Sequence, residues 1–160
     1  MDITKISDRF TVRRLGEGDI PAIYALSSGN KLYYRYHPPF VTAESILDDM
    51  RALPPGKSYA DKYYIGFFDG SQLIAVMDLI LDYHEPGIAF IGFFMTDVSC
   101  QGKGVGSGII SSTAEHLKSA GYGEIRLGVD RGNPQSFAFW SKNQFTVIKE
   151  EKYILMGRRL

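Results

Sequence analysis

Apolar residues in the middle of the chain follow the pattern of β-strands. Residues 63–68, 73–82 and 88–96 form three runs rich in β-branched and aromatic side chains, separated by short turn sequences. Between the first two runs, Asp69-Gly70 is a strong signal for a tight hairpin. The pattern therefore predicts three consecutive antiparallel strands.

The second half of the chain shows helical periodicity. Val105, Ile109, Ala114 and Leu117 recur at helical spacing and predict an amphipathic helix over residues 104–120. The apolar positions of this helix are expected to face the sheet.

Three further elements are predicted beyond this helix. Residues 124–129 form a strand-like run, and Asn133-Pro134 combines a capping residue with a proline suited to the first helical turn. That helix is expected to end near residue 142. Residues 147–155 are expected to supply one or two last strands.

The first fifty residues predict one strand and two helices. The strand covers residues 10–15, and Asp19 is the expected cap of a helix over residues 21–26. Thr42 is the expected cap of the second helix, which stops before a Pro-Pro-Gly sequence. The aromatic stretch of residues 30–40 between these helices is expected to be irregular.

The order of elements predicts an α/β fold around a sheet of mixed direction. The strand that ends at Thr96 and the strand that begins at Glu124 bracket a helix, so these two strands should be parallel. No linker or internal repeat interrupts residues 1–160. We therefore interpret the chain as a single domain in which about four helices flank the sheet.

Composition narrows the class of protein. The chain has 160 residues, with 18 Lys and Arg against 18 Asp and Glu, so no positive excess favours nucleic acid or an anionic membrane. Its single cysteine excludes an intrachain disulfide framework, and its three histidines lack zinc-site spacing. No apolar run reaches the ~18 residues of a membrane span, and the first residues lack an apolar signal segment. We therefore expect a cytoplasmic protein that binds no metal, nucleic acid or membrane.

The segment from Gln101 to Gly108 has glycine at every second position, just before the long helix. Glycine permits positive φ and leaves no Cβ between its amide and a ligand. The first amides of a helix are unpaired and carry partial positive charge, so the segment predicts an anion site, most naturally for phosphate. Lys103 adds a full positive charge beside it. The alternative interpretation is a tight connection without a ligand.

Two nucleotide-binding fingerprints do not fit this segment. A P-loop needs Ser or Thr directly after Gly-Lys, whereas Gly104 follows Lys103. The dinucleotide pattern needs a third glycine at a position that holds Ser107 or Ile109. The segment instead resembles the acyl-CoA signature Gln/Arg-x-x-Gly-x-Gly/Ala of the GNAT superfamily of N-acyltransferases.

A second segment and the order of elements strengthen the resemblance to the GNAT superfamily. Asn133 opens a short helix that contains the aromatic pair Phe139-Trp140, as in the second conserved block of the superfamily. The resemblance extends from about residue 10 to the end of the chain. It implies a mainly antiparallel sheet with one splayed parallel pair, and acyl transfer from a CoA thioester to an amine.

The resemblance also implies a site for acetyl-CoA as co-substrate. The amides of residues 102–106 are expected to hold the pyrophosphate, and the backbone of Met95 and Thr96 to pair with the pantetheine arm. Asn133 is expected to contact this arm, to cap its helix, or to do both, and Trp140 to line the arm or to belong to the core. The residues expected to contact the co-substrate are Met95, Thr96, Gln101, Gly102, Lys103, Gly104, Val105, Gly106, Asn133, Ser136 and Trp140.

The usual general acid and base of the superfamily are absent from their commonest positions. Trp140 stands where many members have a tyrosine, and its indole cannot donate a proton to the leaving thiolate. Phe90 stands where many members have a glutamate. Asp78, in an otherwise apolar strand, is the first candidate to bind or deprotonate the amine, or else makes a structural hydrogen bond at a bulge. Tyr153 is a candidate acid, or simply an aromatic residue of the sheet.

The aromatic stretch lies where the first two helices of the superfamily form part of the acceptor pocket. Tyr33, Tyr34 and Tyr36 are candidates to enclose an amine by cation–π contacts, with His37 beside them, or else these rings cover the sheet. The leading hypothesis is an N-acetyltransferase for a small amine or a peptide, with a homodimer compatible with the fold. The alternative is a non-catalytic module that binds acyl-CoA as a sensor or interaction domain.

Overall fold

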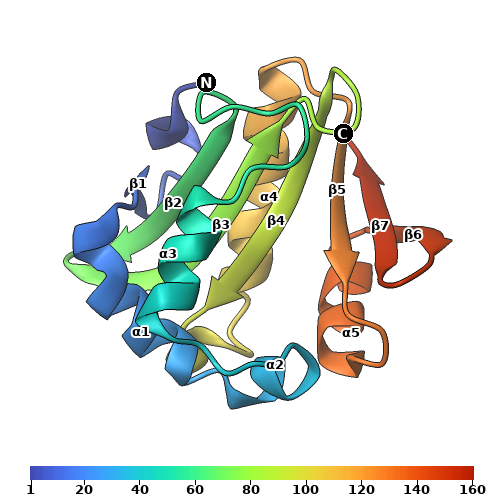
Figure 1. Ribbon diagram of the computed structural model, residues 1–160. Coiled ribbons are helices and arrows are strands. Elements are labelled where there is room, and N and C mark those ends of the chain that lie inside the picture. The colour runs from blue at the N-terminus through green and yellow to red at the C-terminus, as the bar shows by residue number, and fades with distance from the viewer.

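A seven-stranded sheet forms the centre of the protein, and the computed structural model describes all 160 residues (Figure 1). The strands are β1 (Thr11–Arg14), β2 (Lys62–Asp69), β3 (Gln72–Leu81), β4 (Ile88–Thr96), β5 (Glu124–Val129), β6 (Thr146–Glu150) and β7 (Ile154–Arg159). They lie in the order β1-β2-β3-β4-β5-β7-β6. Every neighbouring pair is antiparallel except β4 and β5, which are parallel, so the predicted mixed sheet is confirmed.

Helices cover both faces of this sheet. They are α1 (Ile20–Ser28), α2 (Lys31–Tyr36), α3 (Ala43–Arg51), α4 (Val105–Ser119) and α5 (Pro134–Lys142), with three short 3-10 turns besides. Apolar residues of α1 and α3 pack on one face, in front of the sheet in Figure 1, and those of α4 and α5 pack on the other. No helix is both long and apolar enough to cross a membrane.

The helix α2 corrects the expectation of an irregular segment over residues 30–40. Its sequence has no strong cap, since the Asn30 side chain donates backwards to the carbonyl of Leu26 at 3.0 Å. The helix is held by packing, because the ring of Tyr33 meets Phe93 of β4 edge-to-face with centroids 6.0 Å apart. A six-residue helix stabilised in this way leaves little local signal in the sequence.

The two predicted helix caps have different outcomes. The Thr42 side chain accepts a hydrogen bond from the amide of Ser45 at 3.0 Å, which confirms the cap of α3. Asp19 precedes α1 but makes no side-chain cap. Its carboxylate instead accepts from the Arg13 guanidinium at 2.8 and 3.0 Å and from the Gly16 amide at 2.9 Å.

The parallel strands β4 and β5 pair over only part of their length. Ile88–Ile91 pairs with Glu124–Leu127, and β4 then continues to Thr96 without β5 beside it. A register shift next to Asp78 inserts a bulge into β4 where the separation begins. The pair therefore splays, as expected, and the divergence is visible below the middle of Figure 1.

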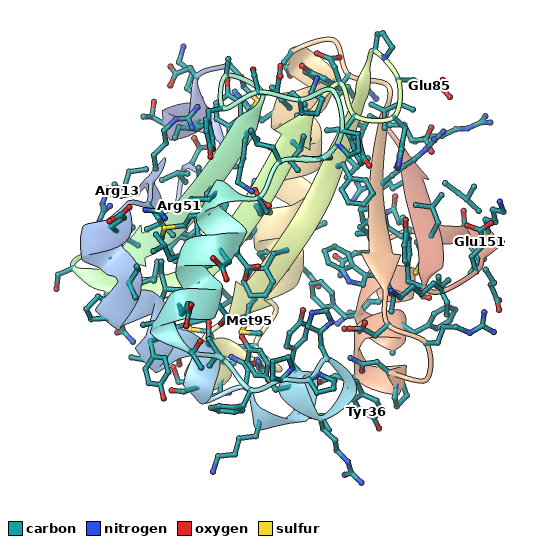
Figure 2. All side chains as sticks on the ribbon, viewed as in Figure 1. Arg13, Tyr36, Arg51, Glu85, Met95 and Glu151 are labelled. Atoms are coloured by element: carbon teal, nitrogen blue, oxygen red, sulfur yellow. The ribbon has the colours of Figure 1, made fainter.

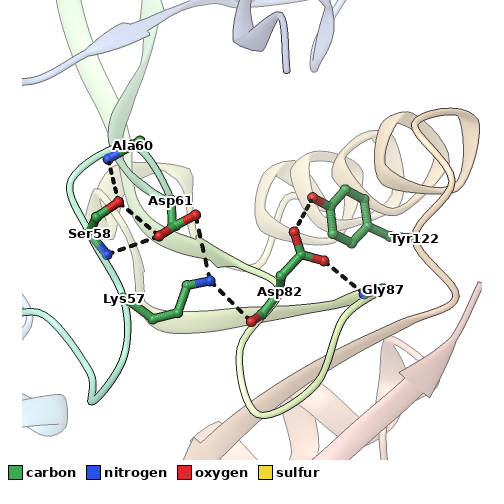
Figure 3. A network of polar contacts seen from close by, with 7 residues as sticks. All are labelled: Lys57, Ser58, Ala60, Asp61, Asp82, Gly87 and Tyr122. Carbon is green, nitrogen blue, oxygen red and sulfur yellow. Dashed lines mark hydrogen bonds and ion pairs between the residues drawn. The ribbon is translucent and has the colours of Figure 1, made fainter.

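A polar network ties the loop after α3 to the turn between β3 and β4 (Figure 3). Lys57 donates to the carbonyl of Asp82 at 3.2 Å and pairs with Asp61 at 3.5 Å. The Asp82 carboxylate accepts from the Gly87 amide at 2.7 Å and from the Tyr122 hydroxyl at 3.3 Å. These contacts hold the loop after α3 against the end of the sheet.

Candidate active site

The glycine segment before α4 presents a continuous run of unpaired amides. Gly102 and Gly104 have φ angles of +72° and +78°, a region that L side chains rarely adopt. The amides of residues 102–107 donate to no acceptor within the protein, whereas the Gly108 amide donates to the carbonyl of Gly104 at 2.9 Å. A run of unpaired amides at a helix N-terminus favours binding of a phosphate group.

Different structural constraints require glycine at different positions of this segment. A Cβ on Gly102 or Gly104 would meet no atom within 4 Å, so positive φ is what requires glycine there. A Cβ on Gly106 would lie 3.2 Å from the ring of Phe139 on α5. Gly106 therefore lets α4 and α5 pack closely, a role that the sequence motif does not distinguish from ligand contact.

The side chain of Gln101 anchors the glycine segment to the rest of the protein. Its amide nitrogen donates to Oδ1 of Asn30 at 2.6 Å, and the buried Asn30 donates to the carbonyl of Thr96 at 3.1 Å. These bonds join the turn to the end of β4 and to the junction of α1 and α2. Gln101 therefore positions the unpaired amides through contacts within the protein.

A cavity of about 230 Å³ opens beside the unpaired amides, between α2, the end of β4 and α5. Four of the residues expected to contact CoA do not line it. The Lys103 side chain is exposed, Val105 is buried in the core, and Asn133 and Trp140 lie elsewhere. The expected residues that do line it are Met95, Thr96, Gln101, Gly102, Gly104, Gly106 and Ser136.

The open edge of β4 is formed by Phe94 and Thr96. The amide of Asp97 donates to the carbonyl of Ile74 on β3 at 2.8 Å, and backbone groups of successive strand residues point to alternate sides. The Met95 amide therefore points toward β3, and those of Phe94 and Thr96 point toward the side that β5 has left. Backbone pairing of an arm with Met95 therefore stays a prediction, and its neighbours Phe94 and Thr96 carry the outward-facing groups. Met95, labelled in Figure 2, is one of the residues that line the cavity.

A second cavity of about 530 Å³ adjoins the first. Tyr33, Phe94 and Ser136 belong to the walls of both cavities. The second wall continues over β4 and β5 and over the loop after α3, at residues 52–54. The two cavities therefore meet where β4 and β5 separate.

Asp78 brings a carboxylate to the wall of the second cavity. The residue is 8% exposed, and its Oδ2 accepts a hydrogen bond from Nζ of Lys62 at 2.7 Å. Its Oδ1 is buried without a partner. Burial raises the pKa of Asp78, and the ammonium group of Lys62 opposes that rise. A carboxyl group in this environment is suited to hold a proton or to bind a cation.

A contact between His37 and Asp130 closes one side of the second cavity. Nδ1 of His37 lies 2.9 Å from Oδ2 of Asp130, and both residues line the cavity wall. The contact joins the segment after α2 to the segment after β5. It therefore bridges the opening between the splayed strands at this side of the cavity.

Comparison with known proteins decides the family. The model of the acetyltransferase (GNAT) family matches residues 25–145, which is most of the chain. The protein belongs to the GNAT family. The fold of this GNAT protein supports acyl transfer from an acyl-CoA, and no curated protein sequence matches the chain significantly.

Solved structures share the fold of this GNAT chain at low sequence identity. An acetyltransferase from Thermus thermophilus aligns with a TM-score of 0.81 at 19% identity, over 94% of this chain and 97% of that chain. The PaiA N-acetyltransferase of Thermoplasma acidophilum, solved in complex with coenzyme A, aligns with a TM-score of 0.72 at 21% identity, over 94% and 99%. A Vibrio cholerae SpeG–hSSAT chimera of spermidine N-acetyltransferase aligns with a TM-score of 0.69 at 17% identity, over 95% and 96%.

The second cavity of the GNAT chain is lined by Phe90 and Trp140, which occupy the usual positions of the base and the acid, and by Tyr153, the candidate acid. Trp140 is also part of the core, with its ring centroid 5.1 Å from that of Phe145. Tyr153 is 44% exposed and lies against Gly128, where a Cβ would be 2.9 Å from the ring. The structure therefore brings both catalytic candidates, Asp78 and Tyr153, to one cavity.

The remaining predicted residues divide between cavity and scaffold. Asn133 is buried, and its side chain accepts from the Ser136 amide at 3.1 Å, so it caps α5 and lines neither cavity. Tyr33 lines both cavities, and burial raises the pKa of its phenol. Tyr34 and Tyr36 line neither, and Figure 2 shows Tyr36 at the outer end of α2.

Four residues of the site were missed by sequence reasoning: Asn30, Lys62, Phe94 and Asp130. A usable signal exists for Lys62, because the hairpin register pairs Tyr64 with Asp78 and places Lys62 diagonally on the same face. The other three residues carry no signal in a single sequence, since their neighbours come from distant segments.

Proposed function

We propose that the protein transfers an acetyl group from acetyl-CoA to a primary amine by direct transfer in a ternary complex. One observation carries the proposal: within the run of unpaired amides, Gly102, Gly104, Gly106 and Ser107 line a cavity that also contains the free edge of β4 and adjoins a second cavity. Such a site provides one place for a diphosphate, a channel for an extended arm and a separate place for an acceptor. The coenzyme A complex of the similar PaiA N-acetyltransferase supports the choice of carrier.

The backbone of this chain accounts for carrier binding. The amides of residues 102–107 bind the pyrophosphate, and the cavity-lining Lys142 adds a positive charge nearby. The outward-facing N–H and C=O of Phe94 and the N–H of Thr96 pair with the arm as a neighbouring strand would, while the Thr96 carbonyl keeps its bond from Asn30. Phe94 lines both cavities, and in this proposal its N–H donates to the thioester carbonyl.

The reaction requires a neutral amine. Its nitrogen forms a bond to the acyl carbon, the carbon–sulfur bond breaks, and the amine loses a proton while the thiolate gains one. An alkylammonium with a pKa near ~10.4 is not a nucleophile, so the acceptor must first be deprotonated. Asp78 binds this ammonium and takes its proton, directly or through water.

Protonation of the leaving thiolate is less critical for the reaction than deprotonation of the amine. A thiol of pKa ~8.5 leaves readily as its thiolate. Tyr153 is placed at the same cavity and supplies a proton where one is needed. Trp140 forms the wall beside it, since an indole transfers no proton at neutral pH.

Thiol release tests the proposal. Purified protein is mixed with acetyl-CoA and a library of amines that includes polyamines, amino acid amides and aromatic amines, and free thiol is followed with a thiol-reactive dye. We expect amine-dependent release, with the acetylated amine detected by mass spectrometry. Calorimetric binding of coenzyme A without release for any amine would instead favour a non-catalytic acyl-CoA module, and absence of binding would refute both.

A further inference from the structure

The wall of the second cavity is dominated by aromatic rings. The rings belong to α2, β4, α5 and the segments after β3 and before β7, and they are Tyr33, Tyr83, Phe90, Phe93, Phe94, Trp140 and Tyr153. Ile80, Leu127 and Val129 add aliphatic surface. A wall of this kind gains most of its binding free energy by covering apolar surface of a ligand.

The two carboxylates that line the second cavity already have nitrogen partners within the protein. Asp78 pairs with Lys62 at 2.7 Å, and Asp130 pairs with His37 at 2.9 Å. The cavity therefore offers no row of unpaired acids for a ligand with several positive charges. A single ammonium group at Asp78 is compatible with this arrangement, because Oδ1 of Asp78 has no partner within the protein.

The second cavity is also bounded at two ends. The contact between His37 and Asp130 joins α2 to the end of β5 on one side. The loop that supplies residues 52–54 is tied to the β3–β4 turn through Lys57 and Asp82 on another (Figure 3). An extended peptide lying across the splay would have to displace the first of these contacts. The boundaries therefore favour a compact acceptor.

We infer, on the basis of the proposed acyl transfer, that the acceptor is a small primary amine with one positive charge and an aromatic body, and that Phe90 determines this specificity. Phe90 lies on β4 next to the splay, at the position where the GNAT superfamily often has a glutamate. Its ring meets Tyr83 edge-to-face with centroids 5.3 Å apart and His84 at 5.6 Å. The position that holds a charged glutamate in many members of the superfamily thus contributes an aromatic ring to the wall of the second cavity.

A panel of four acceptors tests the substrate class: 2-phenylethylamine, ethanolamine, spermidine and an octapeptide with a free N-terminus. We expect kcat/KM for 2-phenylethylamine to exceed that for ethanolamine by roughly tenfold or more, because only the first buries a ring. Spermidine and the octapeptide should react more slowly than 2-phenylethylamine. Faster transfer to any of the other three acceptors would overturn the inference while leaving the proposed function intact.

Substitution of Phe90 tests its role in specificity. Phe90→Ala should lower the preference for 2-phenylethylamine over ethanolamine by roughly fivefold or more, and Phe90→Tyr should retain it. Ile148→Ala, on the exposed edge strand β6, is the matched control and should leave the preference unchanged. Coenzyme A affinity and Tm establish that each variant is folded.

Two further results would count against the inference. An equal loss for both amines in folded Phe90→Ala would mean that Phe90 supports the site without selecting the acceptor. Coenzyme A binding without thiol release for any amine would overturn the proposed function itself, and the inference with it.

Discussion

The buried ion pair between Lys62 and Asp78 can be perturbed from one side by Lys62→Met, which keeps the length and apolar bulk of the side chain. The two side chains are 3% and 11% exposed, and Nζ lies 2.7 Å from Oδ2. At an effective dielectric constant of ~20, two unit charges at this distance attract by about 6 kcal/mol. Removal from water costs each ion several kcal/mol, so the net contribution of the intact pair is small.

Removing one partner is more costly than the net value of the pair, because the other charge stays buried. Lys62→Met is therefore expected to lower the free energy of unfolding by about 3–5 kcal/mol near neutral pH. For a chain of this length, 1 kcal/mol corresponds to roughly 2–4 °C in Tm, so the expected loss is on the order of 10 °C.

The loss should depend on pH with a definite sign. Burial already raises the pKa of Asp78, and without Lys62 it rises further. Between the unfolded pKa of about 3.9 and the raised folded pKa, the folded variant keeps a proton that the unfolded chain releases. The free energy of unfolding of Lys62→Met should therefore be highest below pH ~4. Above that pH it should fall by about 1.4 kcal/mol per pH unit, until the pH reaches the pKa of Asp78 in the folded variant.

Thermal unfolding followed by circular dichroism at several pH values measures this effect. The control is the double variant Lys62→Met/Asp78→Leu, in which no charge is left buried; its stability should return to within about 1–2 kcal/mol of the parent and lose the added pH dependence. Its acyl transfer should remain impaired, because Asp78 is absent. Equal destabilisation by Lys62→Met at pH 5 and pH 8 would refute the reasoning.

Three further predictions concern the scaffold of the site. Gly104→Ala places a side chain at φ +78° and should weaken coenzyme A binding by roughly tenfold, as measured by calorimetry. The control Gly108→Ala, inside α4, should leave the affinity unchanged and raise Tm. Equal affinities for the two variants would contradict the role of the turn. Asn133→Ala should lower the free energy of unfolding by about 1 kcal/mol and Asn133→Asp should not, which denaturant titration can check. Asp130→Asn removes the carboxylate partner of His37, which is half-buried, and should change stability by less than about 1 kcal/mol but raise KM for the amine. An unchanged KM would argue against a role of this contact in the wall of the second cavity.

Local patterns were sufficient wherever one segment contains its own determinants. Residues 62–96 fold as the predicted meander, because Asp69-Gly70 and the alternating apolar runs specify both the turn and the buried faces. The cap of α3 by Thr42 was predictable for the same reason. The failure of Asp19 to cap α1 was not predictable in this way. Its carboxylate accepts hydrogen bonds from the Arg13 guanidinium on β1 instead of from the amides of the helix.

Distant segments decided the rest of the site. The sequence indicated Asp78 but not Lys62, and it indicated the glycine turn but not Asn30, which anchors that turn through Gln101. It also could not separate Tyr33 from Tyr34 and Tyr36, because a six-residue helix has no strong preference for which side faces the cavity.

Local sequence patterns were enough to indicate the GNAT family and the glycine turn before α4. Both depend on glycine spacing, capping residues and hydrophobic period, which act within a few residues of one another. The fold sets which edge of β4 is open, which rings line the second cavity and which carboxylates have a nitrogen partner. Those properties depend on strand register and on contacts between residues far apart in the chain, and no local pattern encodes them.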